Sequence, residues 1–327
     1  MRIIEVLADC GHVDTIRGIA EHNEILDSWI DHSTEETRCS MRLLVRAEKQ
    51  QAVLDAIQQA LGTLEGWRII IHPVDAVLPR AEETEATKKA GTSRSREELY
   101  HEIEAGARAN ATFFWLVIFS TVVATIGLLE DNVAVVIGAM VIAPLLGPNI
   151  ALAFGAALGD KVLISRALQT NLSGILLALI LAYGIGLLWP ADLSSRELMS
   201  RTDVGIAGIV LALVSGAAGI LSLTTGVSST LVGVMVAVAL LPPTATVGLM
   251  LANGFYKQAL GAALLLAVNI VSVNLSAKLV LLVKGVKPRS WLDKKKARQS
   301  ILAYISFWVV TLLILVGVIH LYHTYFM

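Results

Sequence analysis

The sequence predicts a polytopic α-helical membrane protein that begins with a small α+β domain. Over 327 residues, 55% of the side chains are hydrophobic, only 16% are charged, and the mean hydropathy is +0.68. This composition is typical of membrane proteins and excludes an ordinary soluble enzyme of this size. Most charged residues lie before residue 110 and between residues 284 and 298, so the chain divides into a charged N-terminal part and a mostly apolar part.

The first 79 residues alternate short apolar strands with amphipathic helices. Strands are predicted at 2–8, 25–30, 39–47 and 67–72, and helices at 13–22 and 49–61. The order βαββαβ is the signature of a ferredoxin-like or ACT-like fold. Such a domain can bind a small ligand, pair with a copy of itself or cap the membrane part, and the sequence favours the last because it has no glycine-rich phosphate loop.

Two cysteines, Cys10 and Cys39, lie in this domain. Because the topology argued below places it in the cytoplasm, where thiols stay reduced, we expect both cysteines to be free. Cys10 and His12 fall short of a closed set of metal ligands, so no metal is expected.

A polar stretch at 80–98 has no apolar periodicity and predicts a linker that becomes helical as it approaches the membrane. Ser95, with Glu98 three residues later, fits a capping box that opens this helix. The linker and the approaching helix are assigned to 80–110.

Seven apolar segments approach or exceed the roughly 20 residues that a membrane-spanning helix needs. They are 111–129, 133–158, 172–189, 204–223, 231–252, 260–283 and 301–321. Lys and Arg accumulate before the first segment, after the second and after the sixth. The positive-inside rule therefore predicts a multi-pass protein of the inner (plasma) membrane, with a cytoplasmic N-terminus and an external C-terminus. Lys278 is interpreted as snorkelling to the inner interface.

The membrane part contains an internal repeat. A shift of about 95 residues aligns 113–148 with 208–243 and places GAMVIAPLLGP over GVMVAVALLPP. Because each repeat would hold three helices, at 111–190 and 204–284, the second copy would cross the membrane in the opposite sense. The segment 285–327, a basic loop and a final helix, stands outside this 3+3 inverted repeat.

Prolines interrupt the second and fifth segments at matched depth, at Pro144 and Pro148 and at Pro242 and Pro243. A proline removes a backbone donor and displaces the carbonyl four residues earlier, so both helices are expected to be kinked or unwound. Unwound backbone at that depth is tolerated only inside protein or beside a wet cavity.

Polar side chains around the two breaks could surround a small solute with carbonyl, amide and hydroxyl groups. The candidate substrate-binding residues are Pro144, Gly147, Pro148, Asn149, Asn171, Pro242, Pro243, Thr244, Asn269 and Ser272, with Ser173, Thr246, Asn274 and Ser276 nearby. The structural alternative is that the prolines only kink helices and the polar groups only join them.

Acidic residues are expected outside the spans, so a proton relay through buried carboxylates has no carrier. Asp131 and Asp160, in the loops, could hold a cation at either mouth, although solvated loop acids are the simpler interpretation. No catalytic residues, metal or other cofactor are expected.

The GAMVIAPLLGP stretch, the LLEDN turn before it, the ALGD after it and the second LLPP motif resemble a widespread bacterial and archaeal family of integral membrane proteins. That family is described only as an uncharacterised hydrophobic domain, a domain of unknown function. The resemblance covers about 98–283, and many members also have a short N-terminal αβ domain. It implies this architecture but supplies no substrate and no catalytic residue.

Two functions are compatible with these patterns. A secondary transporter or channel-like permease for a small solute or ion would use the inverted repeat and the broken helices. Alternatively, the chain is a membrane-anchored sensor or regulatory scaffold whose αβ domain binds a small ligand. An intramembrane enzyme is not expected, because the spans have no HExxH motif and no paired aspartates. Small-residue patterns on the helices favour a homodimer, and nucleic acid is an improbable partner because the basic residues are dispersed.

Overall fold

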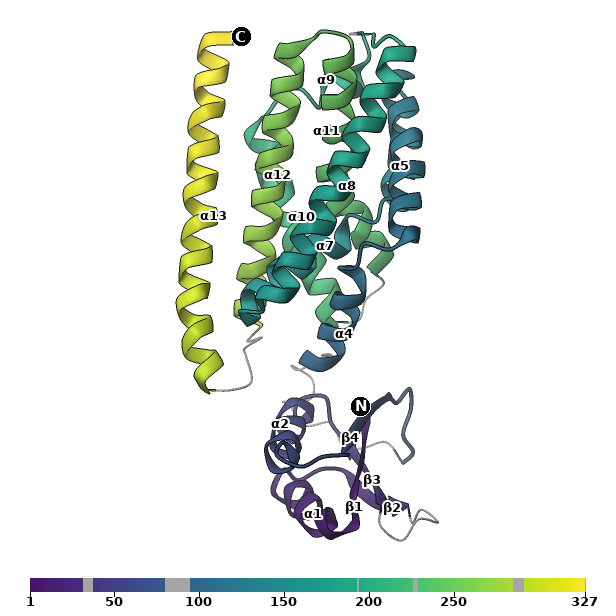
Figure 1. Cartoon of the computed structure of the whole chain (residues 1–327), viewed down its shortest axis with the longest axis vertical. Helices are drawn as coiled ribbons and strands as arrows, with labels where there is room; N and C mark the ends of the chain where they lie inside the picture. Colours follow the sequence, from purple (N-terminus) through teal and green to yellow (C-terminus); the bar gives the residue numbers. More distant parts are fainter. Residues whose placement is uncertain (32–37, 80–94, 193, 226–228, 285–290, 327) are drawn as a thin grey trace. The chain divides into compact units, whose positions relative to one another are not determined.

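The computed structural model contains two compact units, Met1–Leu99 and Tyr100–Met327 (Figure 1). It describes residues 1–31, 38–79, 95–192, 194–225, 229–284 and 291–326. Much of the predicted polar turn near 31–36, the predicted linker at 80–94 and the start of the basic loop after residue 284 lie outside the described residues.

The N-terminal unit is a four-stranded antiparallel sheet with two α-helices. Its elements are β1 (Arg2–Asp9), η1 (Cys10–His12), α1 (Val13–His22), β2 (Asp27–Asp31), β3 (Arg38–Val45), α2 (Gln50–Leu61) and β4 (Arg68–Pro73). The strand order is β2-β3-β1-β4, and β1 runs antiparallel to both of its neighbours. The predicted strands and helices are therefore confirmed to within a few residues.

Alternation along the central strands builds the core of this unit. Ile4 and Val6 of β1 are fully buried, as is Leu43 of β3, because every second side chain of a strand points to the same face. The amphipathic helices cover that face with Ile16 of α1 and Ile57 of α2.

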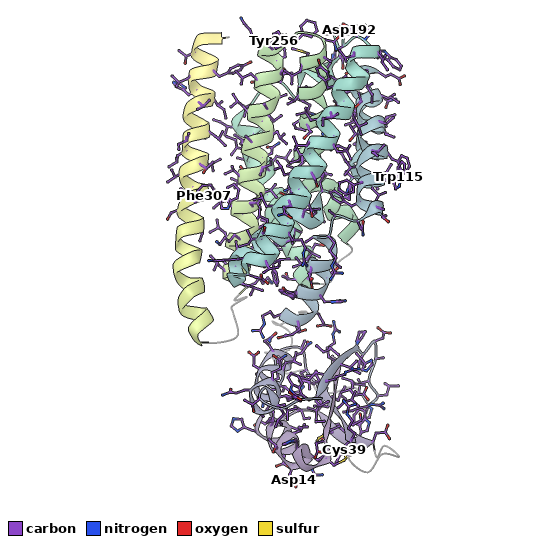
Figure 2. The ribbon with its side chains drawn as sticks, in the orientation of Figure 1. Asp14, Cys39, Trp115, Asp192, Tyr256 and Phe307 are labelled. Atoms are coloured by element: carbon purple, nitrogen blue, oxygen red, sulfur yellow. A yellow bond between two sulfur atoms is a disulfide. The ribbon has the colours of Figure 1, made fainter. Side chains whose placement is uncertain are left out.

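Cys10 and Cys39 form a disulfide, which corrects the expectation of free thiols (Figure 2). Antiparallel pairing puts Ala8 of β1 opposite Cys39 of β3, so Cys10, just beyond the end of β1, lies beside Cys39. Their Cα atoms are 4.9 Å apart, within the range that a disulfide requires. The expectation weighed only the redox compartment, whereas the strand register decides the distance between the two residues.

The predicted capping box at Ser95 and Glu98 is confirmed. The Ser95 amide donates to Glu98 Oε2 at 2.8 Å, and the Glu98 amide donates to Ser95 Oγ at 3.2 Å. These reciprocal bonds satisfy two amides that the first turn of a helix leaves without partners.

The second unit consists of helices, and its first helix, α4, begins in the N-terminal unit. The helices are α4 (Arg96–Gly106), α5 (Ala111–Leu129), α6 (Val133–Ile142), α7 (Leu146–Leu158), α8 (Lys161–Leu188), α9 (Arg196–Met199), α10 (Ile206–Thr225), α11 (Ser229–Ala252), α12 (Tyr256–Val283) and α13 (Trp291–Phe326). Side-chain caps explain where four of them start: Asn110 precedes α5, Asn132 α6, Asp160 α8 and Ser195 α9.

Five helices are long and apolar enough to cross a membrane, or up to six if the bent pair α6 and α7 counts as one crossing. The five are α5, α8, α10, α12 and residues 305–322 of α13, and α11 adds a shorter apolar stretch at 239–252 among the residues searched. The chain therefore has the helices of a membrane protein, while the count of seven crossings stays a prediction.

Helices α5 and α10 run in opposite directions. Ser195, just before α9, donates its hydroxyl to the Leu128 carbonyl at the end of α5, at 2.7 Å. Since α10 follows α9 in the chain, α5 ends and α10 begins at the same end of the bundle, which we call the α9 end (Figure 1). Helices of opposite direction are what an inverted repeat requires.

Of the two expected proline breaks, the first is present and the second is not. Helices α6 and α7 meet at an angle of 53°, with Ala143 extended (ψ 125°) before Pro144. Steric contact with a proline ring disfavours the helical conformation in the preceding residue. Helix α11, in contrast, continues through Pro242 and Pro243, so of the two expected forms, kinked or unwound, the unwound one is wrong here.

A side chain from a neighbouring helix explains the continuity of α11. Pro243 has no amide hydrogen to donate to the Ala239 carbonyl, which lies four residues earlier. Asn269 of α12 donates its Nδ2 to that carbonyl at 2.8 Å. The lost backbone bond is therefore replaced, and the helix can tolerate its prolines.

Lys278 of α12 is not at the surface. Its side chain is 1% exposed, so the snorkelling interpretation is wrong. Helix α12 is packed on most sides by other helices, and its buried face holds this lysine within the protein.

Candidate functional site

Three asparagines from three helices meet inside the helical unit, and we call them the asparagine cluster. Asn149 Oδ1, on α7, accepts hydrogen bonds from Nδ2 of Asn171 on α8, at 2.9 Å, and from Nδ2 of Asn274 on α12, at 3.2 Å. The three side chains are 0%, 4% and 1% exposed, respectively. A carboxamide that joins three helices in this way fixes their spacing and concentrates polar groups at one buried place.

The break between α6 and α7 positions Asn149. Helix α7 begins at Leu146, so Asn149 lies in its first turn, directly after Pro148. Its Nδ2 also donates to the Leu145 carbonyl at 2.9 Å. The helix bend and the cluster are thus parts of one local arrangement.

Several buried polar atoms on α8, α11 and α12 have no hydrogen-bond partner in the part of the chain that the structure describes. They are Oδ1 of Asn171, Asn269 and Asn274, and the hydroxyls of Thr246 and Ser272. Such a group costs about 1–3 kcal/mol, and native interiors leave few of them. Two of the amide oxygens belong to the asparagine cluster, so the cluster retains acceptors that could hold a polar ligand.

A cavity of about 210 Å³ lies among α10, α11, α12 and the loop before α10. Its wall includes Pro243 and Asn269, which the sequence had singled out, together with Ala239. Arg201 and Asp203, beside the start of α10, also line it. Two of the predicted site residues, Pro243 and Asn269, therefore line this cavity, and two others, Asn149 and Asn171, belong to the asparagine cluster.

Hydrophobic packing joins the two proline regions. Met140 and Leu145, on either side of the first break, belong to the same buried cluster as Leu240 and Leu241 beside the prolines of α11. The two proline-containing segments therefore meet inside the bundle.

The remaining candidates have clear local roles. A Cβ atom on Gly147 would lie 2.5 Å from the Gly106 carbonyl oxygen, so this glycine permits a close approach of α4 to α7. Thr244 is buried and donates its hydroxyl to the Leu240 carbonyl at 2.7 Å. Pro144 is half-buried, whereas Pro148 and Pro242 are buried.

Thr244 and Asn149 occupy equivalent positions of the proposed repeat. Each donates a side-chain hydrogen bond to the carbonyl four residues earlier, Leu240 or Leu145, and these two leucines are also equivalent under the same shift. The matched bonds support the sequence alignment of the two halves.

The two loop acids bind to protein groups at opposite ends of the bundle. Asp131 Oδ1 accepts from the Glu197 amide at 2.7 Å, at the α9 end. Asp160 caps α8 and accepts from the Tyr100 hydroxyl at 2.7 Å, beside α4. Burial alone would raise the pKa of Asp160, but hydrogen bonds from the Leu163 amide and the Tyr100 hydroxyl leave it below its ordinary value. These contacts give both carboxylates a structural role.

The sequence named Asn274 only as a nearby polar residue and Lys278 only as an interfacial lysine, and neither was among the candidate substrate-binding residues. A helical face can be drawn through Asn269, Ser272 and Ser276 from spacing alone, but spacing does not say which face of α12 meets α7. The signal available was that Asn274 and Lys278 stand four residues apart, which places a second polar stripe on the same helix.

Comparison with known proteins gives a family without a described activity. Residues 140–275 match a family described as Domain of unknown function (DUF389), and this stretch contains the whole asparagine cluster. The uncharacterized protein MJ0678 of Methanocaldococcus jannaschii is 33% identical over 295 residues, which make up 90% of this chain and 91% of that protein. No solved structure matches the chain. The agreement along nearly the full length of both proteins establishes that this chain belongs to the DUF389 family.

Proposed function

We propose that this chain is a secondary transporter or channel-like permease for a small solute or ion. The observation that carries the proposal is the asparagine cluster, which keeps two amide oxygens without hydrogen-bond partners among the described residues. Polar groups that serve only to join helices would gain most by satisfying one another. Retained acceptors instead suit a bound species that donates hydrogen bonds or carries positive charge.

The depth of the cluster supports a site within the bilayer. Asn171 follows the start of α8 at Lys161 by ten residues, or about 15 Å at the helical rise of 1.5 Å per residue. Asn274 precedes the end of α12 at Val283 by a similar distance. The cluster therefore lies well inside the bundle, away from the ends of both helices.

The cavity at the α9 end supports an approach from one side. It reaches Asn269 and Pro243, which lies about halfway along α11. A closed cluster beside an open cavity is the arrangement expected of a permease that admits its solute from one side at a time.

The proposal includes the finer architecture. Helices α5 to α8 would form the first half of the inverted repeat, with α6 and α7 as one crossing, and α10 to α12 the second, with α13 as the seventh crossing. The antiparallel order β2-β3-β1-β4 supports a ferredoxin-like N-terminal domain. We infer a cytoplasmic N-terminus, an external C-terminus in the inner (plasma) membrane, and a homodimer.

Flux through the full chain in proteoliposomes tests the function. Vesicle swelling with glycerol or urea, and ion flux with Na⁺, K⁺ or ammonium, cover the species that amide oxygens can hold. Asn171→Leu should abolish the flux that the unaltered protein supports. Thr311→Leu, on α13, makes the same change from polar to apolar far along the sequence from the cluster and should leave flux unchanged. Equal flux from both variants would contradict a site at the cluster.

The sensor remains the second candidate, because the N-terminal residues Met1–Leu99 form a compact unit with a core of their own. A full chain that passes none of these species, but whose N-terminal unit shows ligand-dependent protection from hydrogen exchange, would favour it. Protection confined to the helices around the asparagine cluster would favour the permease.

A further inference from the structure

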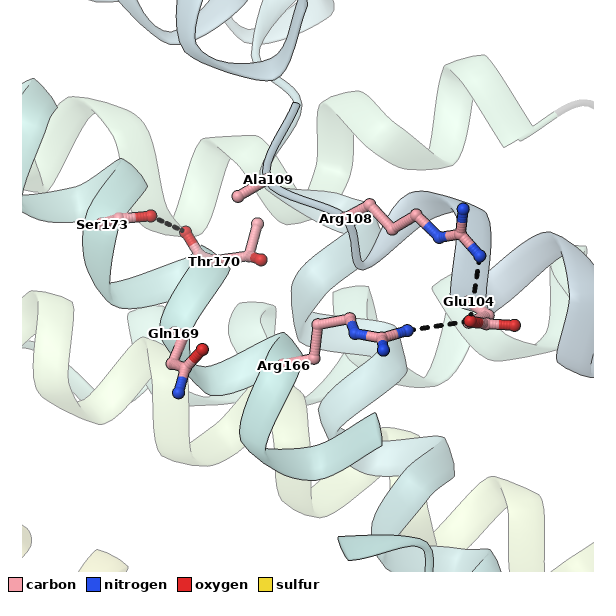
Figure 3. A pocket seen from close by; sticks show the side chains of 7 residues that line it. All are labelled: Glu104, Arg108, Ala109, Arg166, Gln169, Thr170 and Ser173. Atoms are coloured by element: carbon pink, nitrogen blue, oxygen red, sulfur yellow. Dashed lines mark hydrogen bonds and ion pairs between the residues drawn. The ribbon is translucent and has the colours of Figure 1, made fainter. Parts of the chain in front are cut away.

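A second pocket, of about 600 Å³, lies at the end of the bundle where α4 meets α8 (Figure 3). It is lined by Glu104, Arg108, Ala109, Arg166, Gln169, Thr170 and Ser173. Ser173, one of the polar residues predicted near the proline breaks, lines this pocket, whereas the candidate substrate-binding residues do not. The proposed permease makes no use of the pocket. The proposed permease site therefore does not explain the residues of this pocket.

The pocket carries more positive than negative charge. Glu104 Oε1 accepts from Arg166 at 2.8 Å and from Arg108 at 3.1 Å, and Figure 3 shows both guanidinium groups converging on it. One carboxylate offsets only one of the two guanidinium charges. Each guanidinium has five donors, so both retain donors for an anion.

The Thr170 hydroxyl does not contribute to that anion site. It donates to the Ala107 carbonyl at 2.7 Å and so fastens α8 to the segment between α4 and α5. The charged donors on the pocket wall are therefore the two arginines, and Gln169 also lines the pocket.

One stripe of α8 changes from polar to apolar as it leaves the pocket. Arg166, Gln169 and Ser173 follow one another at helical spacing, and Leu176 and Ile180 continue the same stripe. These last two side chains are 48% and 62% exposed. The charged pocket is thus continuous with an exposed apolar stripe on the surface of α8.

Aromatic side chains lie in the first turns of the neighbouring helix, just beyond the pocket. Helix α5 starts two residues after Ala109 and exposes Trp115 and Phe119, whose rings stack 5.8 Å apart (Figure 2). Exposed tryptophan is typical of the boundary between lipid headgroups and hydrocarbon. The pocket therefore lies where a phospholipid headgroup would be.

We propose that this pocket binds the headgroup of an anionic phospholipid, with the phosphate against Arg108 and Arg166 and one acyl chain along Leu176 and Ile180. The arginines supply charge-assisted hydrogen bonds to phosphate oxygens, and the stripe of α8 supplies apolar contact. A free phosphate would meet only the first of these two surfaces. Because the lipid bridges α4 and α8, its binding would also stabilise the contact between them.

Native mass spectrometry of the delipidated full chain tests this site with three probes: phosphatidylglycerol, phosphatidylcholine and inorganic phosphate. We expect phosphatidylglycerol to bind at one site per chain and more tightly than phosphatidylcholine. Replacing both arginines (Arg108→Gln with Arg166→Gln) should weaken phosphatidylglycerol binding by roughly 25-fold, at about fivefold for each arginine near a membrane surface. Lys161→Gln, an exposed charge at the start of α8 that does not line the pocket, should have no effect.

Glu104→Gln separates lipid recognition from a loss of structure. It removes the same ion pairs as the arginine variants but leaves both guanidinium groups without a competing carboxylate, so phosphatidylglycerol should bind more tightly. Weaker binding in Glu104→Gln, or equal weakening by Lys161→Gln, would overturn the proposal. So would equal affinity for phosphatidylcholine, or a failure of phosphatidylglycerol to displace inorganic phosphate.

Discussion

Around Pro144 and Pro148 the chain bends by 53° between α6 and α7, whereas around Pro242 and Pro243 it continues as one helix from Ser229 to Ala252. The two regions occupy equivalent positions of the proposed repeat. They differ in what happens to the carbonyl that loses its backbone donor. In α11 the Ala239 carbonyl receives a hydrogen bond from another helix, and in the first half the backbone turns away before Pro144.

The difference shows that a proline leaves one backbone carbonyl without its usual donor, and that a neighbouring helix can either supply a donor or leave the carbonyl without one. Where Asn269 supplies the donor, helix α11 stays intact and a cavity lies beside the helix. Where the helix bends, a new helix start carries Asn149 into contact with α8 and α12. The bent half therefore hosts the asparagine cluster.

Replacing Asn149 should have the largest effect on stability. Asn149→Leu removes three hydrogen bonds and leaves the buried amides of Asn171 and Asn274 without their shared acceptor, at a cost of roughly 3 kcal/mol in the free energy of unfolding. Its repeat equivalent, Thr244→Val, removes a single local bond and should cost well under 1 kcal/mol. SDS unfolding of the full chain in detergent measures both, and equal losses would mean that the two halves do not differ in this way.

The glycines on either side of the first break should respond oppositely to alanine. Gly147→Ala drives a Cβ to 2.5 Å from the Gly106 carbonyl oxygen, so we expect a loss of about 2 kcal/mol. Nothing lies within 4 Å of a Cβ on Gly138, so Gly138→Ala should be neutral or stabilise α6 by up to about 1 kcal/mol. The same unfolding assay would refute the packing of α4 on α7 if Gly147→Ala were harmless.

Asn269 and Ser272 test how α11 stays continuous. Asn269→Leu leaves the Ala239 carbonyl without a donor and should destabilise the chain by roughly 1.5 kcal/mol. Ser272→Ala removes a buried hydroxyl that has no hydrogen-bond partner among the described residues and should be neutral or stabilising. If the serine variant loses more stability than the asparagine variant, the account of α11 is wrong.

The smallest effect is expected for the hydrogen bond between Tyr100 of α4 and Asp160 at the start of α8. The hydrogen bond to Asp160 raises the pKa of Tyr100 to about 12. It also helps to lower the pKa of Asp160 below its ordinary 3.8. Tyr100→Phe should cost only about 0.5 kcal/mol, because both groups are partly solvated.

The pH dependence of that loss follows from the two shifts. The lowered pKa of Asp160 gives stability that is present above pH 3.8 and disappears as pH falls through the folded-state pKa. The raised pKa of Tyr100 gives stability that is present below pH 10 and disappears as pH rises toward about 12. Unfolding of Tyr100→Phe and the unaltered chain should therefore converge at acid pH, and a constant difference down to pH 3 would contradict this linkage.

Local patterns predicted the elements well, because each depends on nearby residues. Strand alternation, the capping box at Ser95 and Glu98, and the apolar segments all report on their own neighbourhood. The state of Cys10 and Cys39 depends on strand register, and the continuity of α11 depends on a side chain 30 residues away. Such partners are set by tertiary contact, which one sequence does not display.

The sequence identified several residues of the candidate site but not the contacts among them. Asn149 and Asn171 were expected near a proline break, and they do meet. Their third partner, Asn274, lies on a face of α12 that spacing alone could not orient, and Gly147 proved to be a packing contact. Hydrogen bonds between helices decide these roles.

The most direct test of the account is a high-resolution electron cryo-microscopy map of the full chain, recorded with the species that it transports. We predict density within hydrogen-bond distance of Oδ1 of both Asn171 and Asn274, which disappears in Asn171→Leu. An Asn149 side chain turned away from both partners, or density at the α9 end cavity alone that persists in Asn171→Leu, would contradict a site at the asparagine cluster.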